Sequence, residues 1–189
     1  SEEKMNINWS IREKKLKNIF NNYKKNKNYD CLLPTSGGKD SMFQSYALKN
    51  VYKVNPLCVT HGQNWMSTTG RFNLENSLFQ FDLDHLIFIP NRKIINKVAK
   101  KSVHQIGDAC WHCHIGAGSI SIQTSVVWNI NLIVFGEAPA DTDSRGQHKK
   151  IEEVSPYRHL DESAIKKYSD FVDQKTTKKD LSHWAFPTK

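Results

Sequence analysis

The stretch that decides the fold is DCLLPTSGGKDSMFQ, residues 30–44. A short apolar segment, Cys31-Leu32-Leu33, runs into two adjacent glycines, and apolar residues at helical spacing follow from Met42. Glycine lets the backbone turn tightly and approach a ligand without a Cβ in the way. Successive backbone amides at such a turn, together with the start of a helix, form an anion-binding site. The stretch therefore predicts a phosphate-binding loop between a strand and a helix.

The polar side chains of this loop suit the same chemistry. Lys39 supplies a cation, and Ser36 and Ser41 supply hydroxyl donors for phosphate oxygens. Asp40 is expected to cap the helix, to hold a magnesium ion, or both. The spacing is not that of the G-x-x-x-x-G-K-[ST] loop, whose lysine follows a second, more distant glycine. An ordinary tight turn with a serine-rich helix start is the structural alternative.

Further strands and helices are expected on both sides of this loop. Short apolar runs without polar alternation are typical of parallel strands that are buried on both faces. They occur at 31–33, 56–60, 85–89 and 131–136. Segments with helical periodicity separate them, at about 11–27, 42–51, 70–81, 94–102, 115–128 and 161–173. Alternating strands and helices predict an α/β fold with an open, doubly wound parallel sheet.

In such a sheet the ligand binds beyond the carboxyl ends of the strands. The glycine pair, His61-Gly62 and Gly136-Glu137 all follow predicted strands. Glu137 is placed to meet substrate, ammonia or magnesium, or else to cap a loop. His61 and Asn64 after the second strand are weaker candidates for nucleotide contact, as are Arg71 and Asn73 in the next helix for an anionic substrate.

Composition indicates the general class of protein. No apolar run approaches the ~18 residues of a membrane helix and no signal peptide opens the chain, so a cytoplasmic location is expected. The net charge is +8, and residues 1–29 carry eight basic against three acidic residues. A nucleic-acid footprint is one interpretation of that helix, and a solvated face is the preferred one. The expected organisation is an amphipathic helix at 1–29, a nucleotide-binding core at 30–140, and a loop with a helical extension at 141–189.

The cysteines fall into two groups. Cys31 and Cys58 lie in apolar strands and are expected to be buried. Cys110 and Cys113, in the run CWHCH, have three interpretations that the sequence leaves open. They are an inert structural pair, two ligands of a zinc site completed by His104 or His61, or thiols whose pKa is lowered at a helix start for redox or sulfur chemistry. Three tryptophans are assigned to packing or loops: Trp65, Trp128 and Trp184.

The segment SGGKDS after a first strand resembles the PP-loop of the ATP pyrophosphatases, members of the adenine-nucleotide α-hydrolase-like superfamily (HUP, Rossmann-like). These enzymes cleave ATP between the α and β phosphates. The resemblance implies ATP and Mg²⁺ as cofactors, with Lys39, Asp40 and Glu137 as the catalytic residues. It implies that residues 36–41 hold the leaving pyrophosphate while the backbone around 33–35, 59–62 and 136 frames the adenosine. The implied nucleotide-binding residues are Pro34, Thr35, Ser36, Gly37, Gly38, Lys39, Asp40, Ser41, Thr60, His61, Gly62 and Gly136.

Longer stretches resemble the N-acetyl sugar amidotransferases (PseA/WbpG-like) of surface-polysaccharide and flagellin-sugar pathways. The resemblance covers about residues 9–140 and includes TTGRFNLENSLFQFDLDHLIFIPN, GDACWHCHIG and NLIVFGE. It implies that an acetamido group on a nucleotide-linked sugar becomes an acetamidino group. It also implies a separate glutaminase subunit that supplies ammonia and a cyclase-like partner. Relative to the family, the region 141–189 is expected to be incomplete.

Two other functions stay open at this point. A tRNA-thiolating PP-loop enzyme would share SGGKDS and would use Cys110 and Cys113. The G-H-H-x-x-D-like stretch expected in such enzymes is here Gly136-Glu137-Ala138-Pro139, so nucleic acid is not the expected partner. A nucleotide-binding scaffold without turnover is the non-enzymatic alternative.

Overall fold

The core of the protein is a parallel β-sheet. The computed structural model describes residues 8–24, 28–62, 65–136 and 168–187. Strands β1 (Cys31–Pro34), β2 (Pro56–His61) and β3 (His85–Phe88) pair in that order, all parallel. The segment after α6 (Trp111–Val127) lies on the other side of β1 through one parallel bridge, Leu32 to Ile133. The chain thus runs outward from β1 to β3 and returns to the opposite side of β1.

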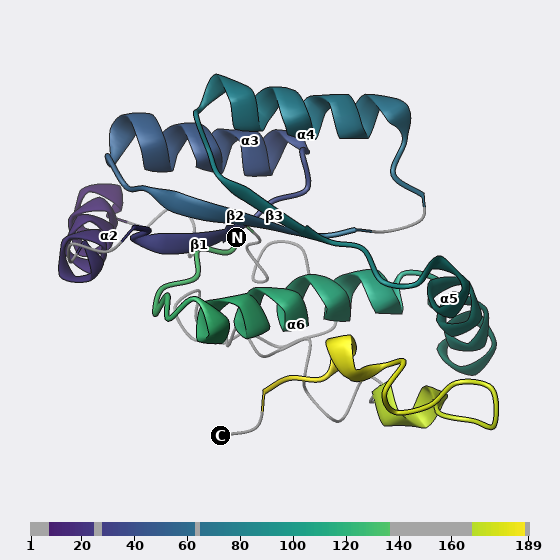
Figure 1. Ribbon diagram of the computed structural model, residues 1–189. Helices are drawn as coiled ribbons and strands as arrows, with labels where there is room; N and C mark the ends of the chain where they lie inside the picture. Colours follow the sequence, from purple (N-terminus) through teal and green to yellow (C-terminus); the bar gives the residue numbers. More distant parts are fainter. Residues whose placement is uncertain (1–7, 25–27, 63–64, 137–167, 188–189) are drawn as a thin grey trace.

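Helices cover both faces of this sheet (Figure 1). α3 (Lys39–Tyr46) and α4 (Thr68–Gln80) lie on one face, and α6 lies on the other. α2 (Trp9–Tyr23) stands at the β1 side, and α5 (Arg92–Ile106) lies beyond the carboxyl end of β3. The predicted open, doubly wound α/β architecture is confirmed.

Side-chain alternation along the strands explains the two layers. Leu32 and Leu57 belong to a buried cluster that includes Ile120 of α6. Cys31, Leu33 and Cys58 point to the opposite face and pack with residues of the α2 and α3 side. Successive side chains of a strand point to opposite faces, so a strand covered on both faces is mostly apolar along its length. Cys31 and Cys58 are fully buried, as predicted, and burial raises the pKa of both thiols to about 12.

Some local predictions were wrong in detail. α2 begins at Trp9, and its N-cap is Asn8, whose Oδ1 accepts a hydrogen bond from the Ile11 amide at 3.1 Å. Ser10 therefore lies inside the helix, which begins two residues before the predicted start at about residue 11. After α3 the helix continues as a π-helical turn, η1 (Ala47–Val51), which periodicity did not indicate. The fourth strand is reduced to two backbone hydrogen bonds, Leu32 N to Leu132 O at 2.8 Å and Val134 N to Leu32 O at 2.9 Å.

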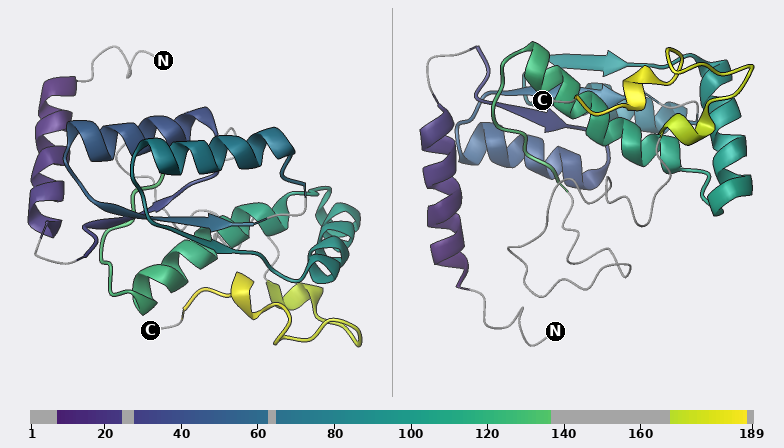
Figure 2. Two further views of the ribbon diagram at one scale, coloured as in Figure 1. Left: turned by 45° about the horizontal axis from the view of Figure 1, so that its top comes forward. Right: turned by 90° about the horizontal axis from the view of Figure 1, so that it is seen from below.

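The C-terminal segment 168–187 packs beneath α5 and α6, as both views in Figure 2 show. It contains the short 3-10 turns η4 (Tyr168–Phe171) and η5 (Ser182–Trp184). Phe171, Leu181 and Trp184 are at most 1% exposed and join a buried cluster with residues of α5 and α6. The sequence showed no clear element here, although the packing role expected for Trp184 is confirmed. The helix expected at 161–173 lies mostly outside the described residues.

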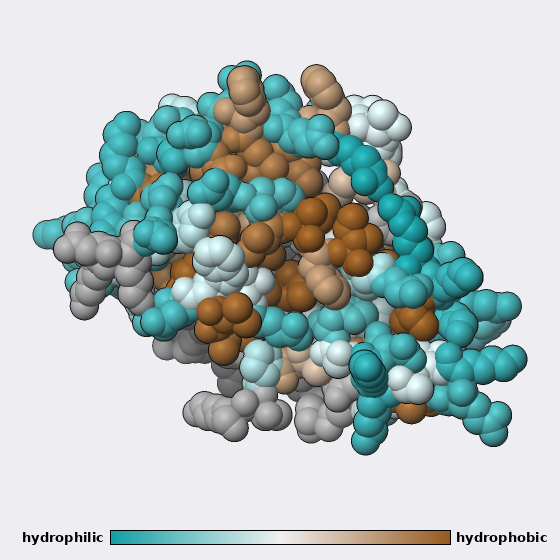
Figure 3. Space-filling view, viewed as in Figure 1, coloured by the Kyte–Doolittle hydropathy of each residue, from teal (hydrophilic) through white to brown (hydrophobic). Residues whose placement is uncertain are grey.

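The face seen in Figure 3 carries hydrophobic atoms at its centre, between the polar rims of the helices. β3 is the last strand in the sheet order of the described residues. Ile87, Phe88 and Ile89 are 40–47% exposed at this open edge.

Within the part of the chain that is described, no helix is long and apolar enough to cross a membrane.

Candidate functional site

The glycine loop joins β1 to α3 as predicted. The Ser41 hydroxyl donates to the Gly38 carbonyl at 2.9 Å, and the Ser36 hydroxyl accepts from the Gly38 amide at 3.3 Å. The Ser36 amide points at the Ser41 hydroxyl at 3.4 Å. These hydrogen bonds to the Ser36 and Ser41 hydroxyls hold the loop in shape without a ligand. The amides of the first turn of α3 have no acceptor within the helix and are available to an anion.

The two glycines of the loop have different structural roles. Gly37 has φ +76°, and a Cβ there would lie 2.7 Å from Cβ and 2.8 Å from Cα of Leu74 in α4. Gly38, the N-cap of α3, has φ −77° and ψ 166°, which any residue adopts. A Cβ on Gly38 would meet only the Ser36 hydroxyl oxygen, at 3.4 Å. The fold therefore requires glycine at position 37, whereas position 38 leaves open space on the exposed side of the loop.

Lys39 and Asp40 lie at the exposed rim of the loop. The Lys39 Nζ and an Asp40 carboxylate oxygen are 2.7 Å apart, and both side chains are largely exposed. Asp40 is in the first turn of α3 and does not cap it, because the N-cap is Gly38 and makes no side-chain cap bond. The capping interpretation of Asp40 is therefore wrong. Its carboxylate is free of the backbone and suits Mg²⁺, which commonly takes one or two carboxylates together with phosphate oxygens.

The topology brings Gly136 to this loop. Successive strands are added on one side of β1, but the segment 132–134 is added on its other side, so the strand order reverses there. Ligands in open α/β sheets bind at this switch point. Gly136 follows the segment 132–134 and lies directly against the side-chain amide of Gln44 in α3. Gly136 therefore lies against the second turn of α3, and its contact with a nucleotide stays a prediction. Glu137 lies outside the described residues, as does Asn64.

The polar ends of β1 and β2 are tied together. The Thr60 hydroxyl donates to the Thr35 carbonyl at 2.6 Å, and the ring Nε2 of His85 lies 2.8 Å from the same hydroxyl. Thr35 and Thr60 are 7% and 3% exposed. The sequence identified both threonines as nucleotide-binding candidates but did not single out His85. The sequence gives no signal for this contact, because it depends on the register between β2 and β3.

His61 packs against α6, and Gly62 packs against the segment after β3. His61 is on the face of β2 that meets α6, and its ring packs against Gly116 of that helix. Burial, with His183 and His112 nearby, lowers the pKa of His61 to about 4. A Cβ on Gly62 would lie 2.6 Å from the Ile89 side chain, so close packing against the segment after β3 accounts for this glycine. Contact of either residue with a nucleotide stays a prediction.

The cysteine pair lies at the start of α6. Cys110 is exposed, while Cys113 is half-buried with its Sγ 3.2 Å from the ring Nε2 of His112. Burial raises the pKa of the Cys113 thiol to about 12, so the lowered pKa expected from the helix start is wrong for this residue. In the ranges that the structure describes, no three His, Cys, Asp or Glu side chains converge in a metal-binding arrangement. Among these residues the pair does not form a zinc site with His104 or His61.

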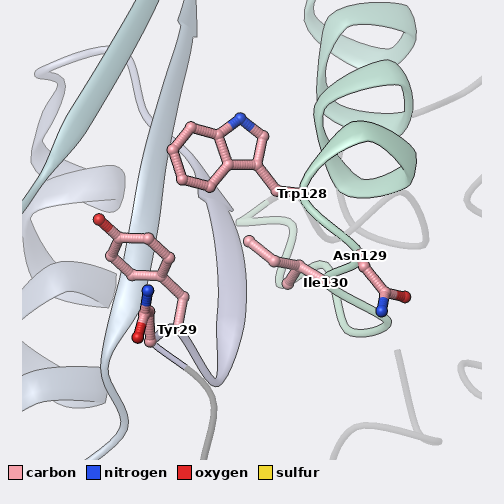
Figure 4. A pocket seen from close by; sticks show the side chains of 5 residues that line it. Tyr29, Trp128, Asn129 and Ile130 are labelled. Carbon is pink, nitrogen blue, oxygen red and sulfur yellow. The ribbon is translucent and has the colours of Figure 1, made fainter.

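One pocket lies at the other end of the sheet. Its walls are Asn28, Tyr29, Trp128, Asn129 and Ile130, from the segments that lead into β1 and leave α6 (Figure 4). The Tyr29 hydroxyl donates to Asp84 at 2.7 Å, and the Tyr29 and Trp128 rings meet edge to face at 6.0 Å. The pocket is therefore at the amino ends of the strands and contains none of the predicted nucleotide-binding residues.

Comparisons with known proteins add the fold relationship. No family model matches the chain. An uncharacterized protein of Methanocaldococcus jannaschii is 35% identical over 81 residues, which are 42% of this chain and 29% of that protein. The chain thus spans under a third of the length of this curated relative.

Two solved structures are similar. The NH3-dependent NAD synthetase from Campylobacter jejuni subsp. jejuni, in complex with the nitrate ion, superposes with a TM-score of 0.51 at 14% identity. The match covers 71% of this chain and 58% of that one. A predicted subunit of tRNA methyltransferase from Methanocaldococcus jannaschii matches at a TM-score of 0.42 and 20% identity, over 65% of this chain and 60% of that one. The likeness to the synthetase, with the strand order and the loop position, gives this chain the adenine-nucleotide α-hydrolase-like fold that the sequence predicted.

Proposed function

We propose that the chain binds ATP at the loop 36–41 and adenylates an amide oxygen, releasing pyrophosphate. The observation that carries this proposal is the placement of the loop. Its open amides lie at the carboxyl end of β1, where the strand order of a doubly wound sheet reverses, with Lys39 at the rim. A triphosphate seated there would meet helix-start amides and a cation at the same place.

The proposed chemistry is adenylation followed by substitution. An amide carbonyl is a poor electrophile, because its nitrogen donates electrons into it. Attack of the amide oxygen on the α-phosphorus of ATP forms an imidate–AMP and breaks the bond to pyrophosphate. Ammonia then adds to the imidate carbon and AMP departs with the former amide oxygen. The products are an amidine, AMP and pyrophosphate, so all atoms balance without a redox step.

The residues of the loop would stabilise charge rather than form covalent bonds. Lys39 and the first amides of α3 would hold the pyrophosphate as negative charge develops on it, the electrostatic kind of catalysis that usually contributes most. Asp40 would hold Mg²⁺, which neutralises phosphate charge when bound. Lys39 must leave Asp40, 2.7 Å away, to reach the phosphates, and the exposure of both side chains permits this.

We further propose that the amide is the acetamido group of a nucleotide-linked sugar and that the product is an acetamidino sugar. The support is the resemblance of residues 9–140 to the N-acetyl sugar amidotransferases. Ammonia would come from a glutaminase subunit in a complex with a cyclase-like subunit, in surface-polysaccharide or flagellin-sugar biosynthesis.

The tRNA-thiolating alternative receives no support from the thiol environment. Sulfur transfer to an activated base requires a thiolate as the nucleophile. Burial holds Cys113 in the protonated form at neutral pH. We therefore prefer nitrogen over sulfur as the incoming atom.

Nucleotide binding is tested first, by calorimetric titration of ATP with Mg²⁺. Gly38→Asp places a carboxylate where phosphate is expected, and Lys39→Ala removes the cation. Each is expected to weaken binding at least about tenfold, the effect of losing a charge-assisted hydrogen bond. Lys100→Ala, an exposed lysine of α5, is the matched control. Unchanged affinity in both loop variants would contradict the site.

The reaction is tested by mass spectrometry. UDP- and CMP-linked acetamido sugars are incubated with the protein, ATP, Mg²⁺ and ammonium. The expected product has one oxygen replaced by NH and appears together with AMP. Pyrophosphate exchange into ATP without any sugar product would support adenylation of another substrate and would contradict the sugar assignment.

A further inference from the structure

We propose that His85 is a positioning residue for the phosphate loop and that it acts through Thr60 and the Thr35 carbonyl. This inference rests on the proposed function, because it assigns a role in holding pyrophosphate at the loop 36–41. Among the described residues, His85 makes no direct hydrogen bond to the loop 36–41. It reaches the loop through a chain of two bonds that crosses from β3 to β2 to β1.

The direction of each bond in this chain is fixed. Thr60 has one hydroxyl proton, and its 2.6 Å bond to the Thr35 carbonyl uses it, because a carbonyl oxygen only accepts. The contact of 2.8 Å between the Thr60 hydroxyl and His85 Nε2 therefore requires a proton on Nε2. His85 must be the Nε2–H tautomer, and it remains a donor when its ring is protonated.

The chain of bonds sets the orientation of one peptide plane. The Thr35 carbonyl and the Ser36 amide belong to the same planar, trans peptide unit, so they point in opposite directions. The Thr35 amide is also fixed, by a bond of 2.9 Å to the Val59 carbonyl. Holding the Thr35 carbonyl toward Thr60 turns the Ser36 N–H into the loop. That amide points at the Ser41 hydroxyl at 3.4 Å, a long contact that a phosphate oxygen would readily replace.

The surroundings favour a positioning role over simple packing. Thr35 and Thr60 are buried, and the chain of bonds leaves neither the Thr35 carbonyl nor the Thr60 hydroxyl unpaired. Donors in such a chain polarise one another, which strengthens the last bond to the carbonyl. Burial lowers the pKa of His85, so the ring is neutral at pH 7 and adds no charge beside the loop.

The test uses two matched pairs of variants in the full chain. Thr60→Val keeps the shape and removes the hydroxyl, and Thr60→Ser keeps the hydroxyl. His85→Leu removes the donor, and His85→Gln places an amide N–H near the former Nε2. Pyrophosphate and adenosine are titrated separately into each variant, at a temperature where thermal unfolding shows all of them folded.

The expected result is a selective loss. Thr60→Val and His85→Leu should weaken pyrophosphate binding about tenfold, as expected for misdirecting one charge-assisted amide bond. In His85→Leu, which changes no residue of the nucleotide site itself, adenosine affinity should change less than twofold. Thr60→Ser and His85→Gln should restore pyrophosphate binding. A merely structural role would weaken both ligands equally or lower stability alone. Equal pyrophosphate affinity in Thr60→Val and the parent would overturn the inference and leave the proposed function intact.

A measurement on the parent protein needs no variant. Nitrogen-15 NMR of the His85 ring should show the Nε2–H tautomer, and the Nδ1–H tautomer would overturn the chain of bonds directly. A parent protein that binds neither ATP nor pyrophosphate would overturn the proposed function and this inference with it. The two failures are thus distinguishable by the parent titration alone.

Discussion

At the scale of single residues, Gly37 is required by the fold, whereas Gly38 is expected to matter for ligand binding. Gly37→Ala should lower the free energy of unfolding by about 2 kcal/mol or more, because φ +76° strains an alanine and its Cβ overlaps the backbone of α4. Gly38→Ala should change stability by less than about 1 kcal/mol, since its φ is ordinary and its Cβ has room. Thermal and denaturant unfolding of both variants measure the difference.

The same pair should behave differently toward ATP. Gly38→Ala adds a methyl group on the exposed side of the loop, where we expect the phosphates, and should weaken ATP binding although the fold is intact. A folded Gly38→Ala variant with the parent's ATP affinity would show that the open space at position 38 is not the phosphate site.

The second residue-scale prediction concerns Cys113. With a pKa of about 12, its thiolate fraction at pH 8 is on the order of a thousandfold below that of an ordinary cysteine. Alkylation of Cys113 by iodoacetamide should therefore be slow in the folded protein and fast in denaturant, as measured by peptide mass spectrometry. Fast alkylation in the native state would bring the sulfur-transfer alternative back.

At the scale of elements, the sequence predicts what local composition determines. β1, β2 and β3 appear where apolar runs predicted them, because the inner strands β1 and β2 are covered on both faces and need mostly apolar residues. The position of the loop 36–41 was equally predictable, since two adjacent glycines at a strand end favour a tight turn. The weak pairing of 131–134 was not predictable. A strand needs a partner along its length, and only Leu32 supplies one among the described residues.

Side-chain direction at the strand ends was also beyond the sequence. Alternation along β2 turns His61 to the face that packs on α6, which the sequence did not indicate, and its contact with a nucleotide stays a prediction. His85 was not expected to matter, because its link to Thr35 depends on the register of three strands. Spacing along the chain does not contain this register.

The contact between β2 and α6 gives an element-scale prediction. Gly116 of α6 touches the His61 ring so closely that a Cβ would overlap it, whereas a Cβ on Gly118 would lie 3.5 Å from the Phe186 ring. Gly116→Ala should lower the free energy of unfolding by about 1–3 kcal/mol through overpacking. Gly118→Ala, in the same helix, should raise it by about 0.5–1 kcal/mol, as expected for glycine replacement inside a helix. Chemical denaturation measures the free energy of unfolding of both variants. Equal changes would contradict the close contact between Gly116 of α6 and the His61 ring.

At the scale of the whole molecule, the C-terminal segment completes the core. Lys101 donates to the Phe171 carbonyl at 2.7 Å and pairs with Asp173, while Gln123 donates to the Ala185 carbonyl at 2.7 Å. The Trp184 ring nitrogen donates to the His112 carbonyl at 2.9 Å. The described part of the region 141–189 is thus packed against α5 and α6 rather than standing apart from them. Sequence periodicity missed this because single buried side chains, not a regular helix, make the contacts.

This packing buries imidazoles and makes stability depend on pH. Burial lowers the pKa of both His61 and His183 to about 4, and the two rings stack 6.2 Å apart with His112 nearby. In the unfolded chain these histidines take up protons near pH 6.5, well before they do so in the folded protein. The unfolded state therefore binds more protons between about pH 6.5 and pH 4, and stability must fall as the pH falls through this window.

The expected slope is at most about 1.4 kcal/mol per pH unit for each histidine. Urea unfolding of the parent at pH 7 and pH 4.5 measures the total loss, which includes titrating carboxylates. His183→Gln stays neutral at both values and should therefore lose less stability on acidification than the parent. His104→Gln, an exposed histidine of α5, is the control and should keep the parent's slope. If the stability of His183→Gln and of His104→Gln falls with pH at the same slope, His183 is protonated as easily in the folded protein as in the unfolded chain. That result would mean that His183 is not buried where the segment 168–187 packs against α6.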